Sequence, residues 1–284
     1  MESFAGKVAV VTGGGSGIGR GISLALADEG MTVAVADLRD AAADAVAAEI
    51  GAVGGAAFGV AVDVTSVDSL ESARAQIEAQ AGGVDLLCAN AGVLARIAPL
   101  DQHTLEDWEY TLSVNVMGVV KTVNAFLPAL RARAPDAHIV NTASLGGLIA
   151  TEGFPIGAYI ASKYACVGYS EMLRTELAGE GIGVSVLCPG VVASDLVTTS
   201  NENRPAPFGA AVAPAMRAGR QDAGASGAPP QAMAAEDVGR VVVNAVKANR
   251  LHVVTHPRSR PVVEGRFAAI LDDYDFAAKS GAGS

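Results

Sequence analysis

Tyr159 and Lys163 stand four residues apart, a spacing that makes two side chains neighbours on one face of a helix. A free phenol titrates near ~10, which is too high for a base at neutral pH. A fixed positive charge beside the phenol favours the phenolate, so the pair could take a proton from an alcohol or give one to a ketone. Ser144 lies a loop's length upstream and could add a hydroxyl. Because such pairs also occur by chance on solvated helix faces, the elements around them must support this chemistry.

Short, continuous apolar runs alternate with helical patterns along the chain. This alternation predicts a doubly wound, Rossmann-like α/β fold with seven parallel strands flanked by helices, in one domain over residues 1–284. The predicted strands are residues 8–11, 32–36, 57–62, 84–88, 138–142, 184–188 and 251–255. The predicted helices include residues 40–50, 66–81, 159–178 and 236–249, a helix that begins after Thr104 and carries Asn115, and an amphipathic terminal helix over 262–274.

The first predicted strand runs directly into a glycine-rich segment, Thr12-Gly13-Gly14-Gly15-Ser16-Gly17-Ile18-Gly19, and a helix that ends at Gly30 follows. A strand, a glycine loop and a helix in this order indicate a dinucleotide site. Glycines let the backbone approach a diphosphate closely, and the amides at the helix N-terminus then face its negative charge. The alternative, a flexible turn that happens to be rich in glycine, explains the flanking elements less well.

Asp37 ends the second predicted strand, about 20 residues after the glycine loop. A carboxylate there can accept hydrogen bonds from the ribose hydroxyls of NAD, and it would repel the extra phosphate of NADP. Arg39 lies two residues further on and could instead hold that phosphate. We expect NAD to be preferred. Asp37 could also be a helix cap, and that role is compatible with cofactor binding.

Two other segments stand out. Asn115 lies inside an apolar helix, where an asparagine should have a specific hydrogen-bond partner or bend the helix. Residues 191–235 are rich in Ala, Pro and Gly, and so long a connection predicts a substrate lid inserted into the domain.

Composition bounds the function. The net charge of −10 argues against nucleic acid or an anionic membrane as a partner. The 3 cysteines lie in separate apolar runs, which indicates buried thiols and neither disulfides nor a metal site. No signal peptide or uninterrupted membrane-spanning run is visible, so we expect a soluble cytoplasmic protein.

These motifs together resemble the short-chain dehydrogenase/reductase family, in its single-domain form, from about Lys7 to Thr255. Thr12, Gly13, Gly17 and Gly19 match its glycine motif, and Asn115, Ser144, Tyr159 and Lys163 match its four catalytic residues. Ala89 stands where a first asparagine is often found, and Ser194 stands where a threonine is common. The cofactor contacts that we expect are Thr12, Gly13, Ser16, Gly17, Ile18, Gly19, Asp37, Asp63, Val64, Asn90, Ala91, Gly92, Tyr159, Lys163, Pro189, Gly190, Val192 and Ser194.

The resemblance implies a role for each catalytic position. Tyr159 would be the general acid/base, and Lys163 would activate it and bind the nicotinamide ribose. Ser144 would hydrogen-bond the substrate oxygen; a turn cap is the less favoured interpretation. Asn115 would hold a water that relays protons to Lys163. Family members are commonly tetramers, which implies a homotetramer or homodimer paired through the Tyr159 and Asn115 helices.

A narrower resemblance concerns the substrate. The stretch from His138, the segment 195–209 and the tail 256–274 are similar to a branch that includes the Cα-dehydrogenases of lignin β-aryl ethers. We therefore expect an NAD-dependent oxidoreductase of class EC 1.1.1 that acts on a hydrophobic, including aromatic, secondary alcohol or ketone. The expected apolar pocket lining is Leu94, Leu145, Leu148, Ile149, Phe154, Val191 and Leu196. The alternatives are a 3-oxoacyl thioester reductase and a non-catalytic dinucleotide-binding sensor.

Overall fold

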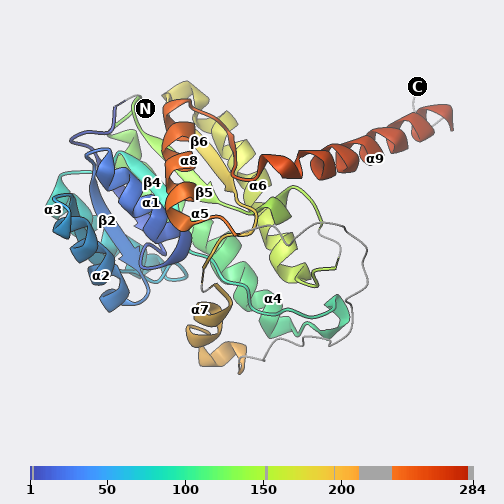
Figure 1. Cartoon of the computed structure of the whole chain (residues 1–284), viewed down its shortest axis with the longest axis horizontal. Coiled ribbons are helices and arrows are strands. Elements are labelled where there is room, and N and C mark those ends of the chain that lie inside the picture. Colours follow the sequence, from blue (N-terminus) through green and yellow to red (C-terminus); the bar gives the residue numbers. More distant parts are fainter. Residues whose placement is uncertain (2, 151–152, 195, 211–231, 281–284) are drawn as a thin grey trace.

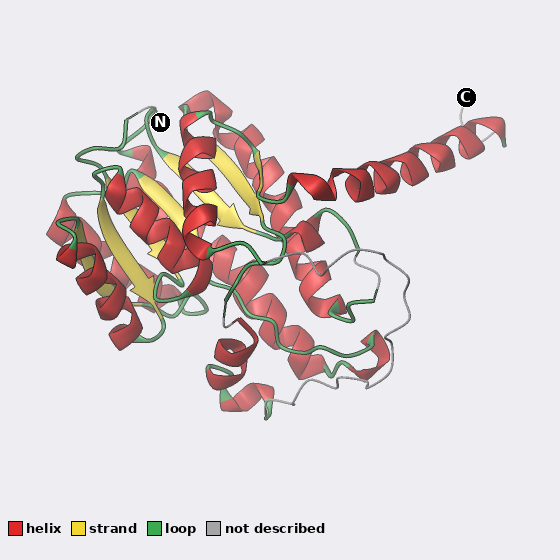
Figure 2. Ribbon diagram, in the orientation of Figure 1, coloured by secondary structure: helices red, strands yellow, loops and turns green. Residues whose placement is uncertain are grey.

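The centre of the molecule is a seven-stranded sheet in which every neighbouring pair of strands is parallel, as the sequence predicts (Figures 1 and 2). The computed structural model describes residues 1, 3–150, 153–194, 196–210 and 232–280. The strand order is β3-β2-β1-β4-β5-β6-β7. The strands are β1 Val8–Thr12, β2 Thr32–Asp37, β3 Ala56–Ala61, β4 Leu86–Ala89, β5 His138–Thr142, β6 Gly183–Cys188 and β7 His252–Val254. The order reverses between β1 and β4, and a ligand crevice forms at such a switch point.

The central strands are buried on both faces, which explains their continuous apolar runs. All five residues of β1 and all five of β5 are buried. Two layers of helices cover the sheet. One layer consists of α1 Gly17–Asp28, α2 Asp40–Ala52 and α8 Ala235–Lys247, and the other consists of α3 Val67–Ala81, α5 Val119–Arg131 and α6 Gly157–Leu177.

Glycine allows α1 and α8 to pack with their backbones in close contact (Figure 1). A Cβ on Gly21 would lie 2.0 Å from the carbonyl oxygen of Ala235, and a Cβ on Gly239 would lie 2.1 Å from that of Gly21. No other residue fits either position without moving a helix. This contact joins the helix that follows the glycine loop to the last part of the chain.

The helix that carries Asn115 is not regular, although the sequence predicts one helix. An α-helix over Leu105–Leu112 (α4) passes through a π-helical turn, Ser113–Gly118, into α5. Thr104 and Asp107 form a capping box at the start of α4. Insertions of this kind often mark functional sites, and this one lies beside the predicted catalytic residues.

The segment after β6 contains structure that the sequence analysis did not assign. A helix forms at Leu196–Glu202 (α7), and a 3-10 turn follows at Ala206–Phe208. Within the predicted lid, residues 195 and 211–231 lie outside the described residues. A second unassigned 3-10 turn, Leu145–Gly147, begins directly after Ser144.

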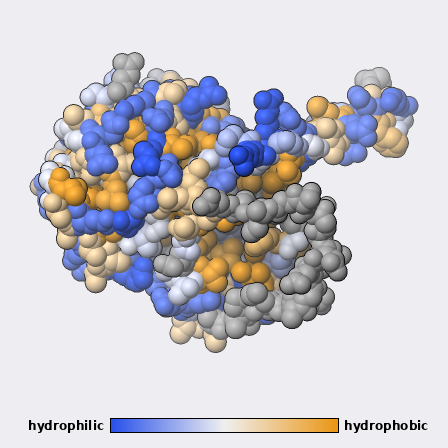
Figure 3. All heavy atoms as spheres, in the orientation of Figure 1, coloured by the Kyte–Doolittle hydropathy of each residue, from blue (hydrophilic) through white to orange (hydrophobic). Residues whose placement is uncertain are grey.

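The terminal helix is longer than predicted and leaves the body of the molecule. It spans Arg260–Lys279 (α9), none of its residues is buried, and it extends away from the sheet as an arm that mixes hydrophobic and hydrophilic residues (Figures 1 and 3). Phe267, Leu271 and Tyr274 are more than half exposed. Near its start the helix contacts α6, where the guanidinium of Arg266 lies 5.2 Å from the centre of the Tyr164 ring, while Phe267, Leu271 and Tyr274 stay largely exposed.

One stretch in the described residues, Leu105–Arg131, is long and apolar enough to cross a membrane by length and composition. The sequence does not show this stretch, because it becomes continuous only when α4, the π turn and α5 join. It packs against the sheet and α3 and carries the buried polar residues Asp107, Thr111 and Asn115. These features are those of a core helix.

Candidate active site at the switch point

The glycine loop between β1 and α1 is held by side chains that the sequence analysis assigned to the cofactor. The hydroxyl of Thr12 accepts hydrogen bonds from the backbone nitrogens of Asn90 (3.0 Å) and Ala91 (3.2 Å). The amide nitrogen of Asn90 in turn donates to the carbonyl oxygen of Thr12 at 3.0 Å. Thr12 is buried and does not line the cleft. It therefore braces the loop from behind.

The loop itself requires glycine for its backbone geometry. Gly13 and Gly17 have φ values of +63° and +48°, which favour glycine. A Cβ on Gly13 would lie 2.9 Å from the Cα of Ala91, and a Cβ on Gly17 would lie 3.1 Å from the Cβ of Ser194. The loop is thus an open cradle at the N-terminus of α1, and it fits the close approach of a dinucleotide diphosphate.

Asp37 lies at the end of β2, where the sequence analysis placed it. Its carboxylate is 6% exposed and accepts hydrogen bonds from the backbone nitrogens of Gly15 and Arg39, each at 3.0 Å. Arg39, and not Asp37, is the N-cap residue of α2. The Nε of Arg39 lies 3.8 Å from the same carboxylate. Asp37 is therefore held rigidly against the glycine loop, as a ribose-binding carboxylate would need to be.

A cleft of about 220 Å³ collects most of the predicted cofactor residues. Those that line it are Gly13, Ser16, Gly17, Ile18, Gly19, Asp37, Asp63, Val64, Asn90, Ala91, Gly92, Tyr159, Lys163, Pro189 and Ser194. Thr12, Gly190 and Val192 do not line it. Val192 instead forms a β-bridge with Met233 and packs against the core around α8.

Tyr159 and Lys163 face the same cleft from the first turns of α6. The Nζ of Lys163 lies 5.4 Å from the centre of the Tyr159 ring and donates to the carbonyl oxygen of Thr142 at 3.0 Å. Lys163 is only 3% exposed. A buried ammonium must have partners, and here they are a strand-end carbonyl and a phenol ring.

Asn115 has the specific partners that its position in an apolar helix predicts. Its side-chain oxygen accepts from the backbone nitrogen of Val93 at 2.8 Å, and its amide nitrogen donates to the carbonyl oxygen of Val93 (2.9 Å) and to the hydroxyl of Ser162 (3.0 Å). It thereby joins the loop after β4 to the Tyr159 helix. Both amide protons are used in these bonds, and the relay water implied by the resemblance stays a prediction.

Ser144 caps a turn, which corrects the interpretation that disfavoured such a role. Its hydroxyl oxygen accepts from the backbone nitrogen of Gly146 at 3.1 Å, at the start of the 3-10 turn. Because the hydroxyl is an acceptor in this bond, its own proton stays available to another oxygen. The cap and the predicted contact with a substrate are therefore compatible.

The predicted apolar lining coincides with the described cleft at one residue. Of the seven residues, only Leu196 lines the described cleft. Leu94 and Ile149 are buried, whereas Phe154 and Val191 are 62% and 54% exposed. Apolar runs in loops do not show which way a side chain turns, and the packing of neighbouring elements decides it.

Other residues of the site were missed. Tyr110, Thr142 and Phe208 line the cleft, and Thr142 also supplies the carbonyl that holds Lys163. The nitrogen of Gly190 donates to Nδ1 of His256 at 3.2 Å, so His256 supports the Pro189-Gly190 turn. Thr142 and His256 could have been found from their places at or just after strand ends. Phe208 lies in a segment without periodicity and gives no such signal.

The described residues contain no group of three His, Cys, Asp or Glu side chains arranged to hold a metal ion. All three cysteines are free and buried, and burial raises the pKa of the Cys88 thiol to about 12. Such thiols are poor nucleophiles and metal ligands. Among the residues that the structure describes, the candidate catalytic side chains are therefore those that face the cleft.

The glycine cradle, the strand-end carboxylate and the Tyr–Lys pair together define a dinucleotide-dependent oxidoreductase site. The family model "short chain dehydrogenase" matches residues 7–205. This chain therefore belongs to the short-chain dehydrogenase family, as the sequence motifs predict.

Individual relatives agree with this assignment. The chain is 32% identical to a "CLA biosynthesis dehydrogenase/reductase" of Lactiplantibacillus plantarum, over 96% of each chain. It is 29% identical to a "C alpha-dehydrogenase" of Sphingobium sp., over 96% of this chain and 88% of the relative. A short-chain dehydrogenase/reductase from Burkholderia phymatum, solved in complex with NAD, has 32% identity and a TM-score of 0.85, with 96% of this chain and 97% of that chain covered.

Proposed function

We propose that this oxidoreductase uses NAD to interconvert a secondary alcohol and its ketone, and that the substrate is hydrophobic and can be aromatic. The observation that carries the proposal is the buried ammonium of Lys163, held beside the Tyr159 ring in the cleft that also contains the glycine cradle and Asp37. A non-catalytic sensor would have no need of a buried charge beside a phenol, because burying a charge is costly.

In the proposed reaction, Tyr159 transfers the proton, and Lys163 stabilises the charged form of Tyr159. The phenolate oxygen of Tyr159 accepts the hydroxyl proton of the alcohol, and the Lys163 ammonium stabilises the negative charge of that phenolate. The proton of the Ser144 hydroxyl is available to hold the substrate oxygen as it becomes a carbonyl. NAD, when bound in this cleft, would supply the acceptor for the hydride of the carbinol carbon. In ketone reduction the same groups act in reverse.

Asp37 supports NAD as the cofactor. It is a buried carboxylate anchored by two backbone amides at the end of β2. An acidic residue about 20 positions after the glycine loop binds the adenosine ribose in folds of this type. A 2′-phosphate at that point would meet a fixed negative charge. The guanidinium of Arg39 already lies beside this carboxylate. Arg39 therefore has less capacity to hold a phosphate.

The similarity to a C alpha-dehydrogenase and the side chains of the cleft support an aromatic substrate. Tyr110, Leu196, Pro205 and Phe208 add apolar surface to the lining. A 3-oxoacyl thioester on an acidic carrier would be repelled by a chain with a net charge of −10. The homotetramer or homodimer and the cytoplasmic location stay predictions.

The proposal is tested by replacing Tyr159 with phenylalanine. We expect turnover of an aryl secondary alcohol such as 1-phenylethanol to fall by roughly 10²–10⁴-fold, because the general acid/base is lost. NAD binding, measured by calorimetry, should stay nearly unchanged. NADH formation is followed by its absorbance.

The matched control is Tyr164→Phe, because Tyr164 lies on the same helix, stacks with Arg266 and does not line the cleft. This control should keep wild-type turnover. A Tyr159→Phe variant that retains most of its activity would show that another group moves the proton.

A further inference from the structure

One wall of the cleft is a segment outside the sheet and its two helix layers. Residues 196–208, which comprise α7 and the following 3-10 turn, contribute Leu196, Asn203, Pro205 and Phe208 to the lining. The same cleft contains Tyr159 and Asp37. The position of this segment therefore contributes to the shape of the cleft that contains the predicted catalytic residues.

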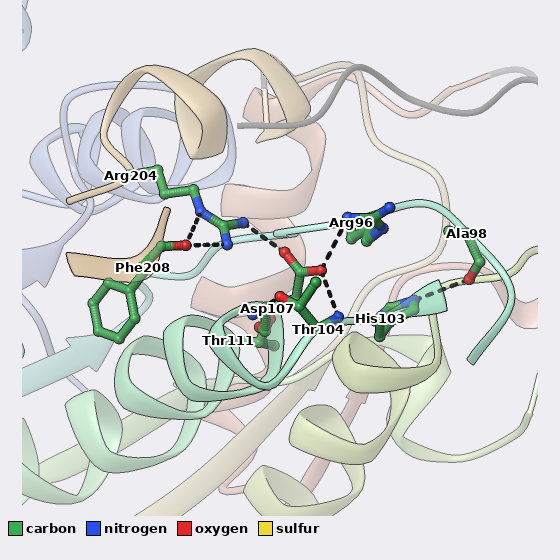
Figure 4. A network of polar contacts seen from close by, with 8 residues as sticks. All are labelled: Arg96, Ala98, His103, Thr104, Asp107, Thr111, Arg204 and Phe208. Carbon is green, nitrogen blue, oxygen red and sulfur yellow. Dashed lines mark hydrogen bonds and ion pairs between the residues drawn. The ribbon is translucent and has the colours of Figure 1, made fainter. Parts of the chain in front are cut away.

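The segment is attached to α4 by a buried ion pair (Figure 4). Nη1 of Arg204 donates to Oδ1 of Asp107 at 2.8 Å, and the two side chains are 3% and 2% exposed. Nε and Nη2 of Arg204 both donate to the carbonyl oxygen of Phe208, with the Nε bond at 3.0 Å. One guanidinium thus joins the connection after α7 to the 3-10 turn of the wall through Phe208, and joins the wall to α4 through Asp107.

Asp107 is fixed from its other side. Its second oxygen accepts from the backbone nitrogen of Thr104 at 3.0 Å and from Nη1 of Arg96 at 3.3 Å (Figure 4). Asp107 belongs to the capping box of α4, so its place is set by the helix start. The carboxylate is therefore a rigid anchor for the guanidinium of Arg204.

Four further contacts hold the wall in the same position. The hydroxyl of Tyr110 donates to the carbonyl oxygen of Ser200 at 3.1 Å, and its ring packs on the Phe208 ring at a centroid distance of 5.4 Å. The nitrogen of Leu94 donates to the Ser200 hydroxyl at 2.9 Å. Arg204 also lies over the Tyr110 ring, 5.4 Å from its centre. Tyr110 thus contacts both the helix and the turn of the wall.

We propose that Arg204 and Asp107 are positioning residues that hold residues 196–208 as the substrate-side wall of the cleft. A buried ion pair is satisfied in one arrangement only, because separating the partners would leave a charge without compensation. The wall therefore stays in one place before a substrate arrives, and preorganisation of this kind lowers the cost of binding. The identity of the substrate rests on the proposed function, whereas the anchoring of residues 196–208 by Arg204 does not depend on it.

The experiment compares Arg204→Met and Arg204→Lys with the wild-type full chain. Methionine keeps the apolar stem but removes all three donor nitrogens of the guanidinium, while Asp107 keeps Arg96 as a counter-ion and α4 keeps its cap. We expect the KM for 1-phenylethanol to rise about tenfold or more, with kcat and the Kd of NAD changed much less. Lysine can still pair with Asp107 but cannot also span to the Phe208 carbonyl, so it should restore part of the loss.

Hydrogen exchange gives a readout that does not depend on activity. Backbone amides of residues 196–208 should exchange faster in Arg204→Met, while those of α2 stay unchanged. The control is Arg131→Met, because Arg131 forms an exposed ion pair with Glu180 and does not line the cleft. It should alter neither exchange in 196–208 nor KM.

Each outcome decides one of the two proposals. Unchanged exchange and unchanged KM in Arg204→Met would overturn the positioning role, as would a loss of thermal stability with KM unchanged. Faster exchange in a chain whose wild type turns over no alcohol or ketone would support the anchoring and overturn the proposed activity.

Discussion

Single side chains in this cleft act through the partners that hold them. Lys163 is directed by a strand-end carbonyl, Asn115 by the backbone of Val93, and Asp37 by two amides. Each polar group is buried, so each lost partner would leave a charge or a donor without compensation. A residue that is needed for chemistry is thereby kept in one orientation before any ligand binds.

The preference for NAD is a prediction at the scale of one residue. We expect Asp37→Ala to weaken NAD binding by about 1.5–3 kcal/mol, roughly tenfold to a hundredfold, because hydrogen bonds to a charged acceptor are lost. The advantage of NAD over NADP should narrow as well. Calorimetric titration with both cofactors measures this.

Asp40→Ala is the control for that titration. Asp40 is an exposed carboxylate at the start of α2, three residues from Asp37, and does not line the cleft. An unchanged ratio of NAD to NADP affinity in Asp37→Ala would remove the ribose assignment.

At the scale of elements, the site exists because a few short connections bring backbone close to backbone. The glycine loop lies against the segment that follows β4, and the π turn presents Asn115 to the loop after β4 and to α6. The wall of residues 196–208 then closes one side. Each of these junctions depends on a tight approach, and so each is sensitive to a single added atom.

Gly13→Ala tests the junction between the glycine loop and the segment after β4. The added Cβ would lie 2.9 Å from the Cα of Ala91, so the loop must shift. We expect NAD affinity to fall by roughly tenfold or more, since a small misplacement of a binding group is costly. Titration of the purified variant by calorimetry measures the loss.

Gly54→Ala separates this effect from backbone strain. Gly54 also has a positive φ, +86°, but a Cβ there would have no atom within 4 Å, and the residue does not line the dinucleotide cleft. Both variants should lose about 1 kcal/mol of stability from the strained backbone. Only Gly13→Ala should lose NAD affinity. Equal affinities of the two variants for NAD would contradict the proposal that the glycine loop binds the dinucleotide.

At the scale of the whole molecule, two helix layers enclose a sheet that buries polar groups as well as apolar ones. His138 begins β5, is fully buried, and has its Nε2 2.8 Å from the Ser185 hydroxyl. Burial, followed by the nearby positive charges of the N-terminus and Arg174, lowers the pKa of His138 to about 3. The folded protein therefore keeps this ring neutral over a range where an unfolded chain would protonate it.

This difference predicts a pH dependence of stability. An unfolded histidine takes up its proton near pH ~6.5. Between that value and about pH 3 the unfolded state binds more protons, so the free energy of unfolding falls as pH falls. His138→Gln should reduce the slope by up to about 1.4 kcal/mol per pH unit. Urea unfolding between neutral and acidic pH measures both slopes.

His252→Gln is the control for the slope, because His252 is exposed and pairs with Glu171 at the surface. It should leave most of the acid dependence in place. If wild type and His138→Gln lose stability in parallel, other groups are responsible for the acid dependence.

The sequence by itself determined the sheet, its parallel direction, the glycine loop and the places of Tyr159, Lys163 and Asp37. Buried strands must be apolar on both faces, and a glycine loop between a strand and a helix leaves a local pattern. These features depend on residues close together in the chain, so their spacing can be read directly.

Only the tertiary structure decided how distant segments meet. Arg204 and Asp107 are 97 positions apart, and no periodicity links them. The hydroxyl of Ser144 caps a 3-10 turn that the sequence of its loop does not show, and of the predicted apolar lining Leu196 alone lines the described cleft. Side-chain direction in loops follows from the packing of elements that come later in the chain. The wall of the cleft could therefore be seen only once all of them were assembled.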